Sequence, residues 1–124
     1  MLARFWAGAL DGYDIAPYDD VEIERLRSIG IDDVEDDPNV LVEAPGVEPR
    51  IFFQLVPESK TVKNRVHLDL TTTASDRAEE IERLLALGAR RVDVGQTGEE
   101  SWDVLADPEG NEFCVVRPKE TLVG

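Results

Sequence analysis

The chain contains a single histidine, His67, in a segment that favours acid–base or ligand-binding chemistry. Residues 65–70 (Arg-Val-His-Leu-Asp-Leu) alternate polar and apolar side chains, which is typical of a half-buried strand. Such a strand places Arg65, His67 and Asp69 on one face. Because a neighbouring carboxylate can tune the pKa and tautomer of an imidazole, His67 is the candidate for proton transfer or ligand binding. The alternative is a histidine that only supports the structure through hydrogen bonds.

Four further residues are candidates for lining a ligand site. Cys114 is the only cysteine, so no disulfide can form within the chain, and it is expected either as a small buried residue or as a nucleophile. Gln54 carries an amide that could bind a polar ligand or a neighbouring side chain. Phe52 and Trp102 are the aromatic residues expected to wall a cavity, because ligand pockets are mostly apolar.

Charge excludes several classes of partner. Lys and Arg number 13 and Asp and Glu 27, which gives a formal net charge of -14. This surplus argues against nucleic acid and against an anionic membrane surface. One basic cluster stands out, Lys60, Lys63, Asn64 and Arg65, either as a solvated connector or as an attraction for an anionic ligand.

Local signals predict three helices that would position these residues. Residues 2–10 have one apolar stripe, and Asp19 and Asp76 are expected to cap helices because a glutamate follows each three residues later. These two helices end near Gly30 and Gly88. The aliphatic face of residues 65–70 (Val66, Leu68 and Leu70) is expected to pack against the last helix.

Strands and turns fill the rest of the chain. Besides residues 65–70, we predict strands over residues 13–16, 40–42, 50–56, 89–94, 102–105 and 113–116. We predict turns at residues 44–49, 95–98 and 107–111. Residues 32–38 are expected to form an acidic connector, and a loose tail is expected from residue 118. The order of elements is similar in two halves, and residues 53–56 match residues 113–116. A duplicated unit is the best account of this pattern, with a first module at 1–57 and a second at 58–124 in one domain of 124 residues.

Three segments together resemble a known superfamily. They are residues 2–10 (Leu-Ala-Arg-Phe-Trp-Ala-Gly-Ala-Leu), residues 56–70, which end in His-Leu-Asp-Leu, and residues 105–115, which contain Asp-Pro-Glu-Gly-Asn. The chain resembles the vicinal-oxygen-chelate superfamily in its glyoxalase-like branch, which also includes bleomycin-resistance-type proteins. The resemblance implies an α+β fold of paired βαβββ modules around a small-molecule cavity.

The resemblance also implies where a divalent metal would bind. Ligands in this superfamily come from the first and last strand of each module. The first strand of module one is missing before residue 2, so no ligand is expected from it. In the last strand of module one, Gln54 stands where the family often has glutamate. In module two, His67 matches a ligand histidine, whereas Cys114 stands where a ligand glutamate is expected. One histidine excludes a two-histidine iron site within one chain. The expectation is therefore no confident cofactor, with His67 as a possible metal ligand.

Three functions remain open from the sequence. The first is a glyoxalase-like small-molecule-binding protein without a complete metal site, for example in resistance or sequestration. The second is a metal-dependent lyase or isomerase of the same superfamily with His67 as a ligand, and the third is an interaction module without a ligand. Whether the chain is an enzyme stays open. We expect a cytoplasmic homodimer, because residues 1–6 lack the features of a signal peptide, no apolar run spans a bilayer, and family members are often dimers.

Overall fold

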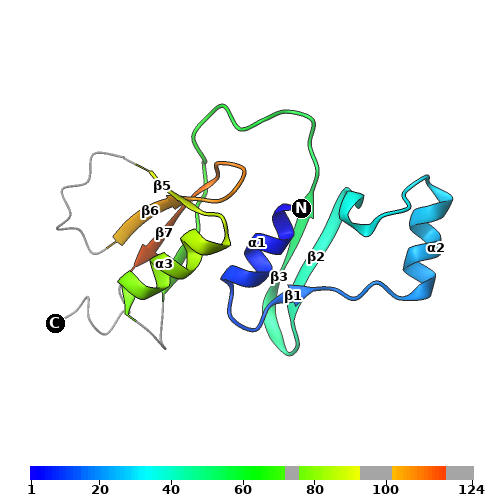
Figure 1. The fold of residues 1–124 in the computed structure, drawn as a ribbon, viewed down its shortest axis with the longest axis horizontal. Coiled ribbons are helices and arrows are strands. Elements are labelled where there is room, and N and C mark those ends of the chain that lie inside the picture. Colours follow the sequence, from blue (N-terminus) through cyan, green and yellow to red (C-terminus); the bar gives the residue numbers. More distant parts are fainter. Residues whose placement is uncertain (72–75, 93–101, 117–124) are drawn as a thin grey trace. The chain divides into compact units, whose positions relative to one another are not determined.

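The computed structural model describes residues 1–71, 76–92 and 102–116, and the chain divides into two compact units, Met1–Pro57 and Glu58–Gly124 (Figure 1). Each unit combines helices with one sheet, so the fold is of the α+β class. Among the described residues, no helix is both long and apolar enough to cross a membrane.

The first unit is a three-stranded antiparallel sheet with two α-helices. Its elements are α1 (Leu2–Ala9), β1 (Asp14–Ile15), α2 (Asp20–Ser28), a 3-10 turn η1 (Val34–Asp36), β2 (Asn39–Ala44) and β3 (Val47–Gln54). The strand order is β1-β2-β3. The unit begins with α1, so the strand expected to precede this helix is not among its elements.

Helix α1 packs against β1 and β2 because its apolar stripe faces them. Ala3 of α1 is buried with Val40 and Val42 of β2, and Phe53 packs partly against this cluster. Side chains alternate along β3, so Phe52 and Gln54 lie on the opposite, exposed face. The predicted site residues of this unit therefore lie on the face away from α1.

The second unit has the βαβββ order. Its elements are β4 (Asp69–Thr71), α3 (Arg77–Leu87), β5 (Arg90–Arg91), β6 (Trp102–Ala106) and β7 (Glu112–Val116). The strand order is β4-β7-β6-β5, in which β4 runs parallel to β7 and the other pairs are antiparallel. The first strand of this unit thus pairs with its last strand, which brings distant segments of sequence together.

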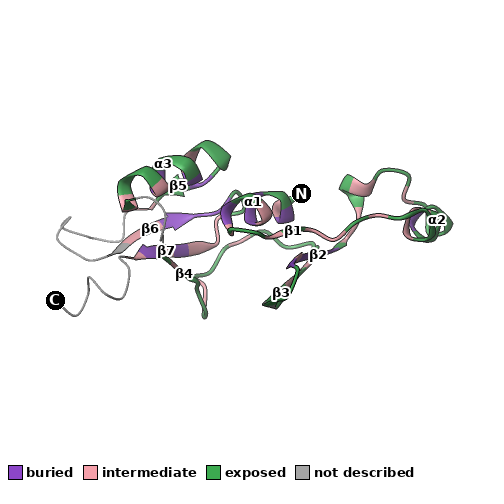
Figure 2. Ribbon diagram, turned by 90° about the horizontal axis from the view of Figure 1, so that it is seen from below, coloured by how far each residue is buried: buried purple, intermediate pink, exposed green. Residues whose placement is uncertain are grey.

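One face of this sheet forms the core under α3. Ile81 and Leu84 of α3 are buried, as are Leu105, Phe113 and Val115 of the sheet. In Figure 2 the buried stretches lie along β6 and β7, whereas the outer side of α3 is exposed. Because neighbours along β7 alternate between the two faces, Cys114 lies on the face opposite to Phe113 and Val115.

The helix caps predicted from sequence are confirmed. Asp19 Oδ1 accepts a hydrogen bond from the Glu22 amide at 2.8 Å, and Asp76 Oδ1 accepts one from the Glu79 amide at 2.8 Å. Helix α3 ends at Gly88, whose φ of 121° is a backbone conformation that suits glycine.

The turn between β6 and β7 is built around the carboxylate of Asp107. This side chain is 1% exposed, and Oδ1 accepts hydrogen bonds from the amides of Glu109 and Asn111, both at 2.9 Å. Asn111 Nδ2 donates to Oδ2 at 3.0 Å, which satisfies the second oxygen. The Asp-Pro-Glu-Gly-Asn segment is therefore a structural turn, as its sequence predicts.

The strand predicted over residues 65–70 is wrong at its start. The residue register with β7 begins at Asp69, and the Cys114 amide donates to the Leu68 carbonyl at 2.9 Å just before it. Ahead of that point the segment contacts β7 through a side chain instead, since Asn64 Nδ2 donates to the Glu112 carbonyl at 2.9 Å. Val66 and Leu68 are 82% and 46% exposed, so the prediction that they pack against α3 is also wrong. The sheet residues Phe113 and Val115 fill that place.

Smaller differences concern turns and strand ends. The turn predicted over residues 44–49 is confined to residues 45 and 46, because β2 continues to Ala44 and β3 starts at Val47. The acidic connector at 32–38 contains the turn η1, capped by Asp33. Strand β5 covers Arg90–Arg91 of the strand predicted over residues 89–94. Residues 93 and 94 of that predicted strand lie outside the described residues, as do the turn predicted at 95–98 and the tail.

Candidate functional site

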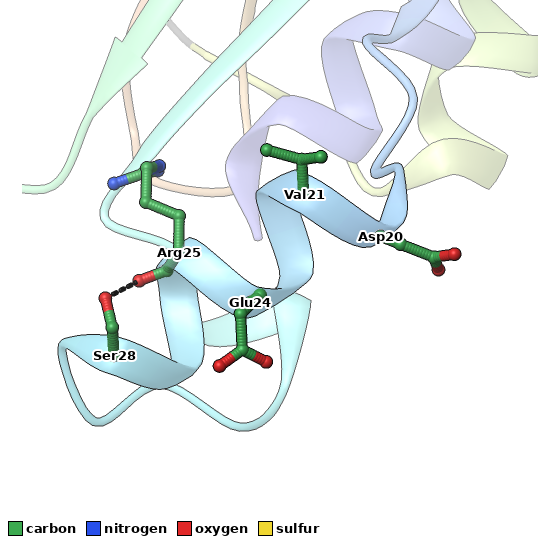
Figure 3. A pocket seen from close by; sticks show the side chains of 5 residues that line it. All are labelled: Asp20, Val21, Glu24, Arg25 and Ser28. Atoms are coloured by element: carbon green, nitrogen blue, oxygen red, sulfur yellow. Dashed lines mark hydrogen bonds between the residues drawn. The ribbon is translucent and has the colours of Figure 1, made fainter.

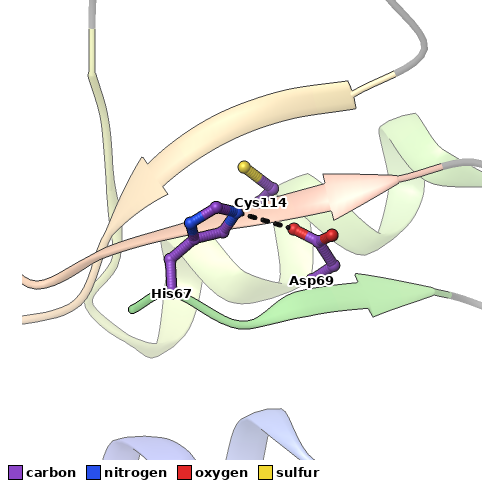
Figure 4. Close-up of side chains that lie close together, drawn as sticks. All are labelled: His67, Asp69 and Cys114. Atoms are coloured by element: carbon purple, nitrogen blue, oxygen red, sulfur yellow. Dashed lines mark ion pairs between the residues drawn. The ribbon is translucent and has the colours of Figure 1, made fainter. Parts of the chain in front are cut away.

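Three side chains that carry metal-binding or acid–base groups meet on the open face of the second sheet (Figure 4). They are His67, Asp69 and Cys114, and one ligand atom from each lies within 4.8 Å of the others. Asp69 opens β4 and Cys114 lies in the middle of β7, where the parallel register makes them direct partners. The pairing of the first and last strands of the unit therefore creates the cluster.

His67 and Asp69 form the most direct contact. His67 Nε2 lies 3.2 Å from Asp69 Oδ1, and the two side chains are 51% and 57% exposed. Since both groups are accessible to solvent, a small molecule or an ion can reach them. The predicted arrangement of His67 beside Asp69 is thus present, although His67 itself precedes the strand.

Cys114 is half-buried, which differs from the fully buried position expected of a small apolar residue. Burial raises the pKa of the Cys114 thiol, and the negative charge and hydrogen bond of Asp69 raise it further, while Lys63 acts in the opposite direction. The thiol is therefore protonated at neutral pH. This disfavours a Cys–His nucleophilic pair, since a nucleophile needs a lowered pKa.

The other predicted site residues lie outside this cluster. Arg65 is exposed in the segment before β4. Phe52 and Gln54 lie in the first unit, on the exposed face of β3. The backbone of Trp102 belongs to β6, and its side chain is outside the described part of the chain. That the two modules face one cavity stays a prediction.

The position of Asp69 beside Cys114 was missed from the sequence. The sequence pattern predicts Asp69 as a ligand-binding residue that tunes the imidazole, but it offers Gln54, and not Asp69, as a metal ligand beside His67 and Cys114. One signal could have indicated this position: His67 and Asp69 are spaced as His-x-Asp on the predicted first strand of module two, and Cys114 lies on the predicted last strand of the same module. Only the parallel register, however, places Asp69 directly beside Cys114.

A depression of about 470 Å³ on α2 does not offer a comparable site (Figure 3). Its lining residues, Asp20, Val21, Glu24, Arg25 and Ser28, all belong to one helix. The Arg25 guanidinium is held by Glu22 at 2.6 Å, and Ser28 Oγ donates to the Arg25 carbonyl at 2.6 Å. With its polar groups engaged in this way, the depression offers little to a ligand.

Comparison with known families agrees with the fold. The model of the glyoxalase-like domain family matches residues 1–116. The chain therefore belongs to the glyoxalase-like domain family. A comparison with curated proteins gave no match.

The similar solved structures share little sequence with this chain. A Bacillus cereus PhnB protein, named as a candidate 3-demethylubiquinone-9 3-methyltransferase, is 12% identical with a TM-score of 0.54, over 94% of this chain and 88% of that one. A hypothetical protein from S. aureus is also 12% identical, with a TM-score of 0.52 over 94% and 84%. A member of the glyoxalase/bleomycin resistance protein/dioxygenase superfamily from Sphaerobacter thermophilus is 20% identical, with a TM-score of 0.42 over 77% and 84%. At these identities the first two comparisons support the fold alone.

Proposed function

We propose that the protein binds a small molecule on the open face of its second sheet, with a divalent metal held by His67, Asp69 and Cys114. The observation that carries the proposal is the meeting of three ligand atoms within 4.8 Å, all on one exposed face. This differs from the family arrangement in which ligands come from four strands, because all three residues belong to one module.

The donor set suits zinc better than a hard cation. An imidazole nitrogen, a carboxylate oxygen and a thiolate sulfur all bind zinc, whereas magnesium and calcium prefer oxygen ligands alone. Ligand atoms around tetrahedral zinc are about 3.3–3.7 Å apart. The three ligand atoms lie within 4.8 Å of one another, so side-chain rotation would have to bring them closer on metal binding, and all three residues are at least partly exposed.

Three metal ligands from the protein would leave the fourth coordination position of zinc free for the bound small molecule. A metal held by the cluster would supply a Lewis acid that polarises an oxygen of this molecule. His67 must be neutral and Cys114 deprotonated to bind, so metal uptake releases protons and weakens as the pH falls. The lyase or isomerase alternative would use the same metal, with a substrate oxygen at the open position.

Metal binding to purified, chelator-treated protein tests the proposal. We expect one equivalent of zinc by calorimetry, and a thiolate-to-cobalt charge-transfer absorption after cobalt replaces zinc. His67→Ala and Cys114→Ser should each weaken zinc binding by about tenfold or more. Glu58→Gln is the matched control, because it also removes a possible ligand but lies outside the cluster. Binding that survives both cluster substitutions would assign the metal to the general acidic surface and refute the proposal.

We further propose that the protein is a homodimer. In the second unit the last strand, β7, has a partner on both edges, whereas β3 of the first unit pairs only with β2 among the described strands. An open edge favours pairing with another strand, and Phe52 is exposed on β3. Light scattering after size-exclusion chromatography should give twice the mass of 13.8 kDa, and Phe52→Lys should reduce it toward the monomer. A monomer at all concentrations would refute the dimer.

A further inference from the structure

A polar hollow lies in the second unit, which also holds the His67 cluster, but its lining residues are different ones. It has a volume of about 340 Å³, at the small end of the range for ligand pockets. Its walls are the loop residues Lys60, Thr61, Val62 and Lys63, Arg90 of β5, and Glu109, Gly110 and Glu112 around the last turn. Three separate segments of the second unit therefore converge on it.

The loop that forms one wall is tied down without any ligand. Lys60 Nζ lies 2.9 and 3.2 Å from the two carboxylate oxygens of Glu112, and Asn64 Nδ2 donates to the Glu112 carbonyl at 2.9 Å. Lys60 and Glu112 are both largely buried, which strengthens their ion pair relative to a solvated one. The same pair holds the pKa of Glu112 below its usual value. The hollow is thus preformed.

Two cations of the lining have no carboxylate partner among the described residues. Arg77, Arg83 and Arg91 of the same unit are paired with Asp103, Glu80 and Glu82, but neither Lys63 nor Arg90 has such a contact there. Lys60 and Glu112 neutralise each other, so the lining keeps two further cations, Lys63 and Arg90, against one further carboxylate, Glu109. The hollow is locally positive in a chain whose net charge is -14.

The glycine of the last turn keeps room between the cationic side chains. Gly110 has a φ of 89°, and a Cβ there would lie 3.4 Å from the Arg90 Nη2 atom and 3.6 Å from Lys60 Cγ. A side chain at this position would therefore project between the arginine and the lysine. Its absence leaves the Arg90 guanidinium accessible from the hollow.

We propose that this hollow binds a small anion through a carboxylate or phosphate group held by Lys63 and Arg90. A guanidinium presents a planar fork that matches two oxygens of such a group, and an ammonium adds a point charge beside it. The residues of the hollow include none of the metal cluster. The proposal therefore uses no member of the metal cluster, although the charge of Lys63 also acts on Cys114.

The test uses the complete chain and two probes, inorganic phosphate and malonate, at constant ionic strength set with sodium chloride. Amide shifts in a nitrogen-15 correlation spectrum report binding at each residue. We expect saturable shifts at Thr61, Lys63 and Gly110 for at least one probe. The probe that saturates distinguishes a phosphate site from a carboxylate site.

Three substitutions with the same change of charge separate a site from general electrostatics. Lys63→Gln and Arg90→Gln should each weaken binding by about threefold or more, as expected for losing one partly exposed ionic contact. Arg91→Gln is the matched control, because Arg91 is the next residue on β5 but lies outside the hollow and pairs with Glu82. Shifts that do not saturate, or an equal loss of affinity in Arg91→Gln, would overturn the proposal.

Discussion

Asp69 adds to the effect of burial on the thiol beside it. Its carboxylate contacts both the imidazole of His67 and the thiol of Cys114, so one negative charge acts on two groups. In metal-free protein it stabilises the protonated thiol, whereas a bound cation would reverse that preference. Replacing Asp69 should therefore affect the Cys114 thiol differently in metal-free and in metal-bound protein.

The first prediction concerns the reactivity of Cys114 in chelator-treated protein. Asp69→Asn removes a negative charge that raises the thiol pKa, so it should increase the rate of alkylation by iodoacetamide at pH 8 by about two- to fivefold. Rates measured from pH 7 to 10 should show the midpoint moving to lower pH. Glu82→Gln on the outer side of α3 is the control, and an equal rate increase there would contradict the assignment.

A second prediction concerns Tyr18 in the first unit. Burial and a 2.8 Å hydrogen bond to Asp37 raise the pKa of Tyr18 to about 12. Because this pKa lies above the unfolded value of about 10, the contribution of Tyr18 to stability is complete below pH 10 and is lost as the pH rises toward 12. Absorbance at 295 nm in a Tyr13→Phe background isolates this titration. Asp37→Asn should lower the midpoint, and an unchanged midpoint would exclude the contact as a cause.

At the level of elements, the turn from β6 to β7 fixes the strand that carries Cys114. Asp107→Ala would leave the partly buried amides of Glu109 and Asn111 without their acceptor, so the free energy of unfolding should fall by about 1–3 kcal/mol. Urea denaturation followed by circular dichroism measures this loss. Glu109→Ala in the same turn removes an exposed side chain and should cost less than about 0.5 kcal/mol. Similar losses in both variants would contradict the central role of Asp107.

Elements with local signals could be predicted from the sequence. The caps at Asp19 and Asp76 and the turn at Asp107 depend on residues two to four positions away, which the sequence displays directly. The start of β4 could not be predicted, because it depends on where this segment pairs with the distant strand β7. Period-two alternation alone extends the strand too far.

The site was predictable only in part for the same reason. His67 and Asp69 are neighbours in sequence, so their contact followed from spacing. The contact of Asp69 with Cys114 requires the parallel register of β4 and β7, which no short pattern encodes. The half-buried position of Cys114 likewise depends on which face of the sheet α3 covers, and that face is set by Phe113 and Val115.

The whole molecule carries more negative charge than its ion pairs can compensate. With a net charge of -14, mutual repulsion in the compact state should be relieved by salt. Raising sodium chloride from about 10 to 150 mM should therefore increase the melting temperature by a few degrees. Potassium chloride at the same concentrations is the control for an ion-specific effect. A fall in melting temperature would show instead that pairs such as Lys60–Glu112 outweigh the repulsion.

The pairing of β4 with β7 has a consequence for how the protein is made. During synthesis His67 leaves the ribosome long before Cys114, and the segment around His67 cannot pair with β7 until residues 112–116 have been released. Such a non-local closure is slow compared with the formation of α3, which needs only neighbouring residues. The cluster proposed to hold a metal should thus form late in folding, and a nascent chain truncated before residue 112 should lack it.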